Sequence, residues 1–275
     1  MDISLAFSPC PNDTFIFDAL IHQKIDCQGL RFIPHLADVE ALNQAALQNI
    51  YQVSKLSYFG WGFCRDRYAL LRAGSALGFG VGPLLISKDI NVLNTQTLPT
   101  VFVAGEKTTS HFLLSVAYPQ LKNKQFVLFA DIEDKTLATE NSLGLIIHEN
   151  RFTYTQKGLY KIADLGEWWQ NHTQLPIPLG GIVATKTFEP ELRAQISQLI
   201  RKSIAFAQQN PQSSKNYIKS LAQELKDEVI QQHIDLYVND FSLDLQPLGE
   251  RAVRFLLAKA EGLNLIPRQE IVISG

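Results

Sequence analysis

The amino-acid sequence predicts an α/β fold in which mainly parallel sheets are flanked by helices and the C-terminal part is almost wholly helical. Two observations carry this prediction. Before Glu189, short apolar runs of strand character alternate with segments in which apolar residues recur at helical spacing. After Glu189 the helical spacing continues almost to the end of the chain. Strands that alternate with helices are joined by crossover connections, which place the strands of a sheet parallel.

The N-terminal part of the chain begins this alternation. Strands are predicted over residues 3–7, 31–36, 53–58 and 82–87. Helices are predicted over residues 13–23, after Asp38, and over residues 63–71. A short polar side chain can accept hydrogen bonds from the first N–H groups of a helix, so Asp38 is expected to cap the second helix. Asn12 or Asp13 either caps the first helix or points toward a ligand.

The middle of the chain repeats the pattern, and the tail replaces it with helices. Strands are predicted over residues 100–104, 126–129, 143–147 and 182–184, with a helix over residues 109–117. Amphipathic helices are predicted over residues 192–208, 214–238 and 247–262. No linker rich in Pro, Ser or Gly separates these parts, which argues against independent domains in a row.

Composition excludes several functional classes. Hydrophobic residues make up 46% and charged residues 19% of the 275, which is typical of a folded globular protein. A net charge of -2 gives no reason to expect nucleic acid or a membrane surface as partner. The longest apolar runs fall far below the roughly 20 residues of a membrane span. No signal peptide is recognisable, and three cysteines in no zinc or disulfide pattern indicate a reducing cytoplasm.

Several short segments, in chain order, carry a recognisable pattern. They are SPCPNDTF at 8–15, DVEALN at 38–43, KLSY at 55–58, GSALG at 74–78, GEKTT at 105–109, IHE at 147–149 with RFTY at 151–154, DLG at 164–166 with WW at 168–169, and PIPLGG at 176–181. Together they resemble the 1,4-dihydroxy-6-naphthoate synthase family of the futalosine route to menaquinone. The resemblance ends near Ile182, before the helical tail.

This resemblance implies a two-lobed fold of the type 2 periplasmic-binding-protein class. The larger lobe would consist of residues 1–89 and 183–275 and the smaller lobe of residues 90–182, with the active site in the cleft between them. The chain would be a carbon–carbon lyase with no metal and no organic cofactor. Its substrate would be cyclic dehypoxanthine futalosine, a benzoate-bearing modified sugar. A small molecule is thus the expected partner, and both a monomer and a homodimer fit the sequence.

His148 is the candidate catalytic residue. It follows the apolar strand predicted over residues 143–147, at the end where α/β sheets present functional groups. An imidazole can accept a proton near neutral pH, as a general base must. From the bare sequence a histidine at a strand end is more often a surface or hydrogen-bonded residue, but the resemblance assigns the matching histidine as proton acceptor. Glu149 either orients His148 or is a solvated charge at the strand end.

Two sets of residues resemble the family's substrate-contacting segments. The first is Lys55, Leu56 and Ser57, in which Lys55 and Ser57 share one face of the strand by its period of two. Asn12 and Asn43 are further candidates for binding substrate. Two of these residues have a structural alternative. Lys55 fits a surface cation, and Asn43 fits a helix residue that faces solvent.

The second set is Thr108, Thr109 and Ser110, at a junction between a predicted strand and a predicted helix. Free N–H groups and hydroxyls at a helix N-terminus favour a carboxylate or polyol oxygen, although a simple helix cap needs the same residue types. His111 and Ser110 depart from the family pattern, in which a small apolar residue is expected first. For the substrate carboxylate itself, Lys55 and Arg151 are both candidates.

Other functions share parts of this pattern. A solute-binding protein, or the related enzyme that dehydrates chorismate in the same pathway, would use the same fold. The segments at 8–15 and 147–149 favour the synthase. The glycines between Gly74 and Gly82 lack the Gly-Lys-Ser/Thr ending of a phosphate-binding loop and are expected to form tight turns.

Overall fold

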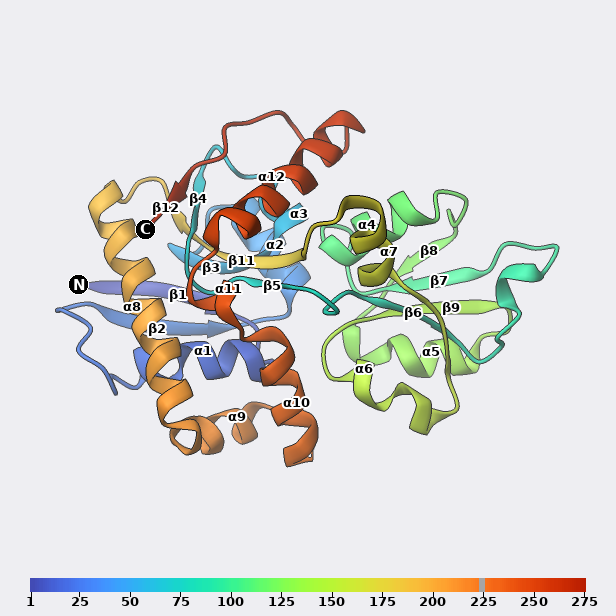
Figure 1. Cartoon of the computed structure of the whole chain (residues 1–275), viewed down its shortest axis with the longest axis horizontal. Coiled ribbons are helices and arrows are strands. Elements are labelled where there is room, and N and C mark those ends of the chain that lie inside the picture. Colours follow the sequence, from blue (N-terminus) through green and yellow to red (C-terminus); the bar gives the residue numbers. More distant parts are fainter. Residues whose placement is uncertain (223–225) are drawn as a thin grey trace. The chain divides into compact units, whose positions relative to one another are not determined.

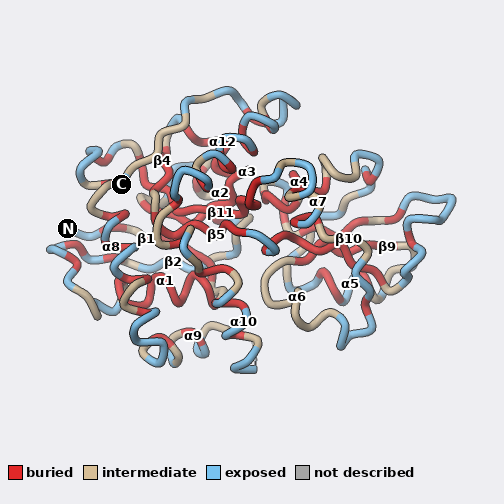
Figure 2. Tube along the Cα trace, viewed as in Figure 1, coloured by how far each residue is buried: buried red, intermediate tan, exposed pale blue. Residues whose placement is uncertain are grey.

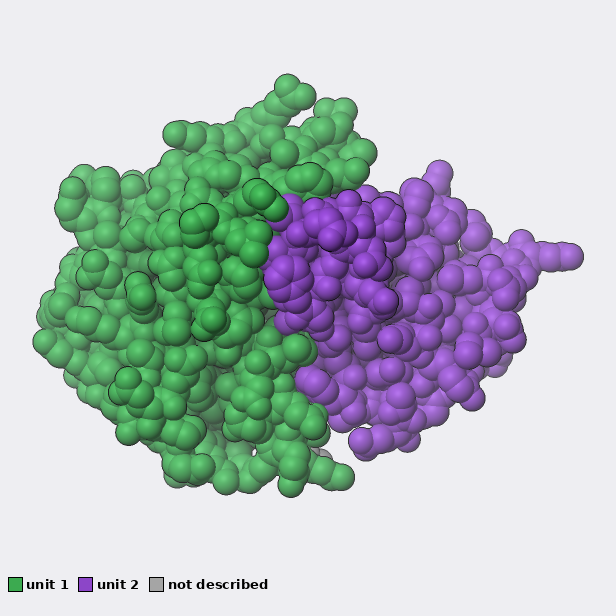
Figure 3. Space-filling view, viewed as in Figure 1, with its two compact units in different colours: residues 1–78, 178–275 green, residues 79–177 purple. Residues whose placement is uncertain are grey.

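The computed structural model describes residues 1–222 and 226–275, which form two compact units (Figure 3). Unit 1 consists of Met1–Gly78 and Pro178–Gly275, and unit 2 of Phe79–Ile177. The chain therefore crosses from one unit to the other twice. Strand β6 (Leu84–Ser87), which the predicted boundary at residue 89 assigns to the larger lobe, belongs to unit 2 because it pairs with two strands of that unit.

Unit 1 is built on a mixed sheet in the order β12-β4-β11-β3-β1-β2, with β5 joined to β11. Its strands are β1 (Asp2–Phe7), β2 (Arg31–Leu36), β3 (Val53–Ser57), β4 (Tyr68–Leu71), β5 (Ala76–Gly78), β11 (Ile177–Thr185) and β12 (Ile273–Ser274). Helical crossovers make β1 parallel to β2 and β3, whereas β11 runs antiparallel to β3 and β4. Strands β3 and β11 are buried along their whole length (Figure 2).

Helices cover this sheet, and the tail supplies most of them (Figure 1). They are α1 (Pro11–Ile21), α2 (Val39–Leu47), α3 (Tyr58–Trp61), α8 (Pro190–Gln209), α9 (Lys215–Leu221), α10 (Asp227–Tyr237), α11 (Asp240–Leu243) and α12 (Gln246–Gly262), with a 3-10 turn, η4 (Pro211–Ser214). Helix α1 packs against α8 and α10. Their contact buries Phe17, Ile200 and Ile234 in the same core as Phe7 of β1.

Unit 2 has a smaller mixed sheet in the order β10-β6-β9-β7-β8. Besides β6, its strands are β7 (Thr100–Val103), β8 (Lys124–Phe126), β9 (Ser142–Ile146) and β10 (Tyr160–Asp164). Its helices are α4 (Thr109–Ala117), α5 (Ile132–Ala138), α6 (Asn150–Thr153) and α7 (Leu165–Thr173), with 3-10 turns η1 (Val92–Asn94), η2 (Phe129–Asp131) and η3 (Tyr154–Lys157). The core of unit 2 includes Ile86, Phe102, Ile132 and Ile146.

The structure confirms the α/β class and several elements in detail, but both sheets are mixed rather than mainly parallel. The strand at residues 31–36 and the helix at residues 109–117 have the predicted bounds. Asp38 caps α2, because its Oδ1 accepts a hydrogen bond from the Ala41 N–H at 3.0 Å. The predicted helix at 214–238 is divided into α9 and α10 instead, and its residues 223–225 lie outside the described residues.

Some local predictions are wrong. The strand predicted over residues 126–129 is absent, because β8 ends at Phe126 and Phe129 begins the 3-10 turn η2. The segment predicted as a helix over residues 63–71 ends in strand β4, whose four residues are all buried between β11 and β12. A short, fully apolar run fits a buried strand as well as a buried helix. Neither Asn12 nor Asp13 caps α1, which begins at Pro11 after Cys10 and has no side-chain cap. Proline tolerates this first position because it has no N–H that needs a partner.

Among the described residues, none of the helices has the length and apolar character needed to cross a bilayer.

The segment just before β6 is packed against the first turn of α7 within unit 2. A Cβ atom added at Gly82 would lie 2.1 Å from the Gly166 Cα and 2.2 Å from its backbone nitrogen. The two backbones can therefore approach only because neither residue has a side chain.

We expect Gly82→Ala to destabilise unit 2 by about 1–3 kcal/mol, the usual cost of overpacking a tight contact. The measurement is the urea midpoint followed by circular dichroism. Gly262→Ala is the matched control, because a Cβ there meets nothing within 4 Å and should leave the midpoint unchanged or slightly raised. Equal midpoints for Gly82→Ala and the wild type would contradict the close contact.

Burial disfavours ionisation of two of the three cysteine thiols, those of Cys27 and Cys64. It raises the pKa of Cys64 to about 12 and also raises the pKa of Cys27. Since only the thiolate attacks a disulfide reagent, Cys64 of the folded protein should be modified at pH 8 at least ~10³-fold more slowly than after unfolding in urea. Peptide mass spectrometry identifies the modified residue, with Cys64→Ala as control. Rapid labelling of Cys64 in the folded protein would refute this expectation.

Candidate active site

The candidate site residues lie at a few places within the two units. Unit 1 contains Asn12 on α1, Asn43 on α2, and the three consecutive residues Lys55, Leu56 and Ser57 on β3. Unit 2 contains Thr108, Thr109 and Ser110 at the start of α4, and His148 after β9.

The centre of the unit 1 group is a buried ion pair. Asp13, in the first turn of α1, is 2% exposed, and Lys55 of β3 is 4% exposed. The Lys55 Nζ lies 3.0 Å from the Asp13 Oδ1 and donates a hydrogen bond of 3.0 Å to the carbonyl oxygen of Gly74. A buried ammonium needs such partners because its desolvation costs several kcal/mol. Lys55 is therefore not the surface cation that the sequence also allowed.

The Asp13 carboxylate also accepts hydrogen bonds from Ser8 and Asn12. Its Oδ2 accepts from the Ser8 hydroxyl at 2.7 Å and from the Ser8 backbone N–H at 3.3 Å. Its Oδ1 accepts from the Asn12 Nδ2 at 2.9 Å. The carboxylate thus joins the end of β1, the first turn of α1 and strand β3. The sequence gives no signal for this role of Asp13, because Lys55 lies far along the chain.

Asn43 fixes the end of β3. It is 1% exposed, its Oδ1 accepts from the Ser57 backbone N–H at 3.0 Å, and its Nδ2 donates to the Ser57 hydroxyl at 3.3 Å. A Cβ at Gly60 would lie 2.5 Å from the Asn43 Oδ1, so the glycine leaves room for this amide. The solvent-facing alternative for Asn43 is wrong. Leu56 alternates to the other face of the strand and is buried.

The start of α4 is a hydroxyl-rich turn. Thr108 is the N-cap residue: its hydroxyl oxygen accepts from the His111 N–H at 3.2 Å and donates to the Gly105 carbonyl at 2.9 Å. The Ser110 hydroxyl lies 2.9 Å from the Thr108 hydroxyl. Thr109 is also buried. The predicted helix start is confirmed, and capping of α4 accounts for part of what Thr108 does.

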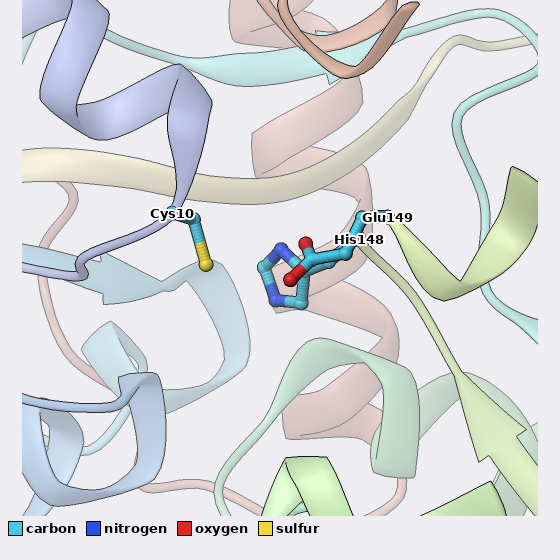
Figure 4. A group of neighbouring side chains, drawn as sticks. All are labelled: Cys10, His148 and Glu149. Atoms are coloured by element: carbon cyan, nitrogen blue, oxygen red, sulfur yellow. The ribbon is translucent and has the colours of Figure 1, made fainter. Parts of the chain in front are cut away.

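His148 lies on the turn that follows β9 (Figure 4). Its φ of 56° is in the left-handed region, which is uncommon for a residue with a side chain. Its ring meets the Phe129 ring edge-on, with centroids 5.0 Å apart. A ring nitrogen of His148 and a carboxylate oxygen of Glu149 lie within 4.8 Å. The imidazole is half-buried, packed on one side and beside a carboxylate.

The chain just after His148 is anchored to α5 by Glu133. This carboxylate is 2% exposed, and its Oε2 accepts from the Asn150 Nδ2 at 2.6 Å and the Lys157 Nζ at 2.7 Å. The hydrogen bond to Glu133 raises the pKa of Lys157. Sequence reasoning missed Glu133, because on a short polar helix it resembles an ordinary solvated charge.

Arg151 connects the segment after His148 to the segment before β6 and to Asp164. Its guanidinium donates hydrogen bonds to the carbonyl oxygens of Gly80, at 3.0 Å, and of Gly82. It also lies 3.7 Å from the carboxylate of Asp164, whose Oδ1 caps α7. Both candidates for the substrate carboxylate, Arg151 and Lys55, therefore already have a carboxylate partner within their own unit.

Neither unit, taken by itself, brings three His, Cys, Asp or Glu ligand atoms together among the described residues as a metal ion would need.

Solved structures define the class of fold. A protein of Archaeoglobus fulgidus has 30% sequence identity and a TM-score of 0.88, with 96% of this chain and 98% of that chain covered. The alkanesulfonate-binding protein of Xanthomonas axonopodis has 11% identity and a TM-score of 0.71, with 98% and 96% covered. The ligand-binding component of an import system of Staphylococcus aureus has 12% identity and a TM-score of 0.72, with 100% and 96% covered. The fold is therefore periplasmic-binding-protein-like.

Sequence comparison then gives the family. A family model described as menaquinone biosynthesis matches residues 3–262. A 1,4-dihydroxy-6-naphthoate synthase of Thermus thermophilus is 44% identical, and one of Streptomyces coelicolor is 36% identical, each over 96% of this chain and 95% of the relative. The chain belongs to this 1,4-dihydroxy-6-naphthoate synthase family of menaquinone biosynthesis, and it is an enzyme. The resemblance found in the motifs is confirmed.

We expect Lys55→Met to lower the free energy of unfolding by about 3–5 kcal/mol, because it leaves the Asp13 carboxylate buried without its cation. Urea unfolding monitored by circular dichroism provides the measurement. The double variant Lys55→Met/Asp13→Asn removes both charges and should recover part of the loss. Lys202→Met, on an exposed position of α8, is the control and should change stability by less than about 0.5 kcal/mol. Equal stability of the Lys55 and Lys202 variants would contradict a buried ion pair.

Proposed function

We propose that the chain converts cyclic dehypoxanthine futalosine to 1,4-dihydroxy-6-naphthoate, with His148 as the general base. Membership of the family supports the reaction, since the curated relatives are named for this product. The observation that carries the role of His148 is its backbone conformation. The residue follows strand β9, its φ is 56°, and it is half-buried. Such a conformation costs on the order of 1–3 kcal/mol and persists only where the surroundings hold it.

The surroundings of His148 supply that support. The His148 carbonyl accepts from the Arg151 N–H at 3.3 Å, and Arg151 is itself fixed by the carbonyl oxygens near β6. Two residues after His148, Asn150 is held by the buried Glu133. Phe129 limits the motion of the ring. These contacts favour one orientation of the imidazole before substrate binds, which is what an efficient proton acceptor requires.

The chemistry we propose needs only acid–base groups. His148 removes a proton from the substrate, a carbon–carbon bond to the sugar-derived part breaks, and the bicyclic ring becomes aromatic. Aromatisation makes the overall step favourable.

Each unit, taken by itself, offers residues that we propose as substrate ligands. In unit 2, the Thr109 hydroxyl and the first N–H groups of α4 offer donors to carboxylate or sugar oxygens, and the hydroxyl oxygens of Thr108 and Ser110 offer acceptors to sugar hydroxyls. In unit 1, Lys55 and Ser57 offer an ammonium and a hydroxyl, with Asn12 and Asn43 beside them. A cytoplasmic location, a small-molecule substrate and the lack of a nucleic-acid or membrane partner stay predictions from the sequence.

We expect His148→Asn to lower kcat by roughly 10²–10⁴, the usual effect of losing one acid–base group. Asparagine is the informative replacement because it tolerates the left-handed backbone, so the loss cannot be attributed to strain. The assay incubates purified protein with cyclic dehypoxanthine futalosine and follows the naphthoate by absorbance and mass spectrometry. His148→Ala serves as a second variant, and turnover near that of the wild type in either would disprove the role of His148.

The wild-type protein in the same assay separates the alternatives. Multiple turnovers support the lyase. Tight binding without turnover would indicate a solute-binding protein, and neither binding nor turnover would make chorismate the next substrate to test.

A further inference from the structure

We propose that His233 is a positioning residue that fixes the Asn12 amide and, through it, the Asp13–Lys55 ion pair. His233 comes from α10, in the helical tail to which the sequence assigned no function. The part of this inference that concerns substrate rests on the proposed function, because Asn12 and Lys55 are proposed substrate ligands. The hydrogen-bond arrangement itself does not depend on that function.

A continuous line of buried polar contacts connects the four side chains within unit 1. The His233 Nε2 lies 2.9 Å from the Asn12 Oδ1. The Asn12 Nδ2 donates to the Asp13 Oδ1 at 2.9 Å, and the same oxygen lies 3.0 Å from the Lys55 Nζ. All four residues are buried: His233 is 0% exposed and Asn12, the most exposed of them, only 5%. Buried polar contacts of this kind are strong and orientation-specific because water cannot replace them.

The direction of each hydrogen bond follows from the donors and acceptors available. An ionised carboxylate can only accept, so Asn12 must present its NH₂ group to Asp13. Its carbonyl oxygen then faces His233, and an oxygen can only accept. The His233 Nε2 must therefore carry the proton. One ionised group, Asp13, thus determines the protonation of a ring nitrogen on a helix that is 221 positions away from Asn12 in the sequence.

Removal of the His233 donor has a defined consequence. The buried Asn12 oxygen would lose its N–H partner, and the amide would no longer be fixed on the side that faces α10. A displaced amide withdraws its NH₂ group from the Asp13 Oδ1, the oxygen that also holds Lys55. The effect should therefore appear in substrate binding by Asn12 and Lys55 rather than in proton transfer by His148.

The first test is made on the wild-type protein without substrate. A long-range ¹H–¹⁵N NMR spectrum of histidine-labelled protein, with His233→Gln used for assignment, reports which ring nitrogen carries the proton. We expect a protonated Nε2 on His233. A neutral ring protonated only on Nδ1 would overturn the inference, whatever reaction the enzyme catalyses.

The second test uses steady-state kinetics with cyclic dehypoxanthine futalosine. His233→Leu removes the donor and should raise KM about 5- to 30-fold, the equivalent of one lost buried hydrogen bond, with a smaller change in kcat. His233→Gln keeps an N–H donor and should stay within about 3-fold of the wild type. In an Asn12→Ala background, His233→Leu should raise KM no further, because the two residues act as one unit.

Opposite results would overturn the inference. They are a His233→Leu protein that is folded but keeps the wild-type KM, or an increase in KM that is equally large with and without Asn12. If His233→Leu does not fold, the comparison of His233→Gln with Asn12→Ala and the NMR result still decide. Absence of turnover in the wild type would count against the proposed function alone, since the protonation of His233 is measured without substrate.

Discussion

The buried ion pair between Lys55 and Asp13 is the constraint on which the arrangement of unit 1 around its proposed ligands depends. One carboxylate joins the end of β1, the first turn of α1 and strand β3, through Ser8, Asn12 and Lys55. Because an unpaired charge at this depth would cost several kcal/mol, these elements must keep the geometry that brings the pair together. The substrate ligands proposed in unit 1 are thus held by the same contacts that close its core.

Unit 2 uses a buried carboxylate in a comparable way. Glu133 is as deeply buried as Asp13, and it holds Asn150 and Lys157 of the segment that follows His148. This anchoring is needed because the chain leaves β9 in a left-handed turn, which is costly for a histidine. In each unit, therefore, a buried carboxylate with no proposed contact to substrate holds a segment that carries, or directly follows, a residue proposed to act on it.

Sequence reasoning found the residues whose roles follow from local pattern. The alternation of apolar runs predicted most strands, Asp38 was recognisable as a cap, and the motif around His148 marked the candidate base. It failed where the partner is distant in the chain. Residues 68–71 fit a helix by local pattern, because only the pairing of β4 with β11 and β12 makes them a strand. Likewise the sequence leaves Asp13 open between a helix cap and a ligand contact, because nothing near it in the chain indicates Lys55 as its partner.

The same contacts bear on how an anionic substrate could be accommodated. A lysine ammonium has three N–H donors, of which Asp13 and the Gly74 carbonyl use two, so one is left for a substrate oxygen. The pair carries no net charge, and Arg151 is likewise near a carboxylate, that of Asp164. Neither cation therefore offers a full uncompensated charge. For the proposed substrate, recognition of the carboxylate would then depend on directed N–H and O–H donors, such as those proposed at the start of α4, more than on net attraction.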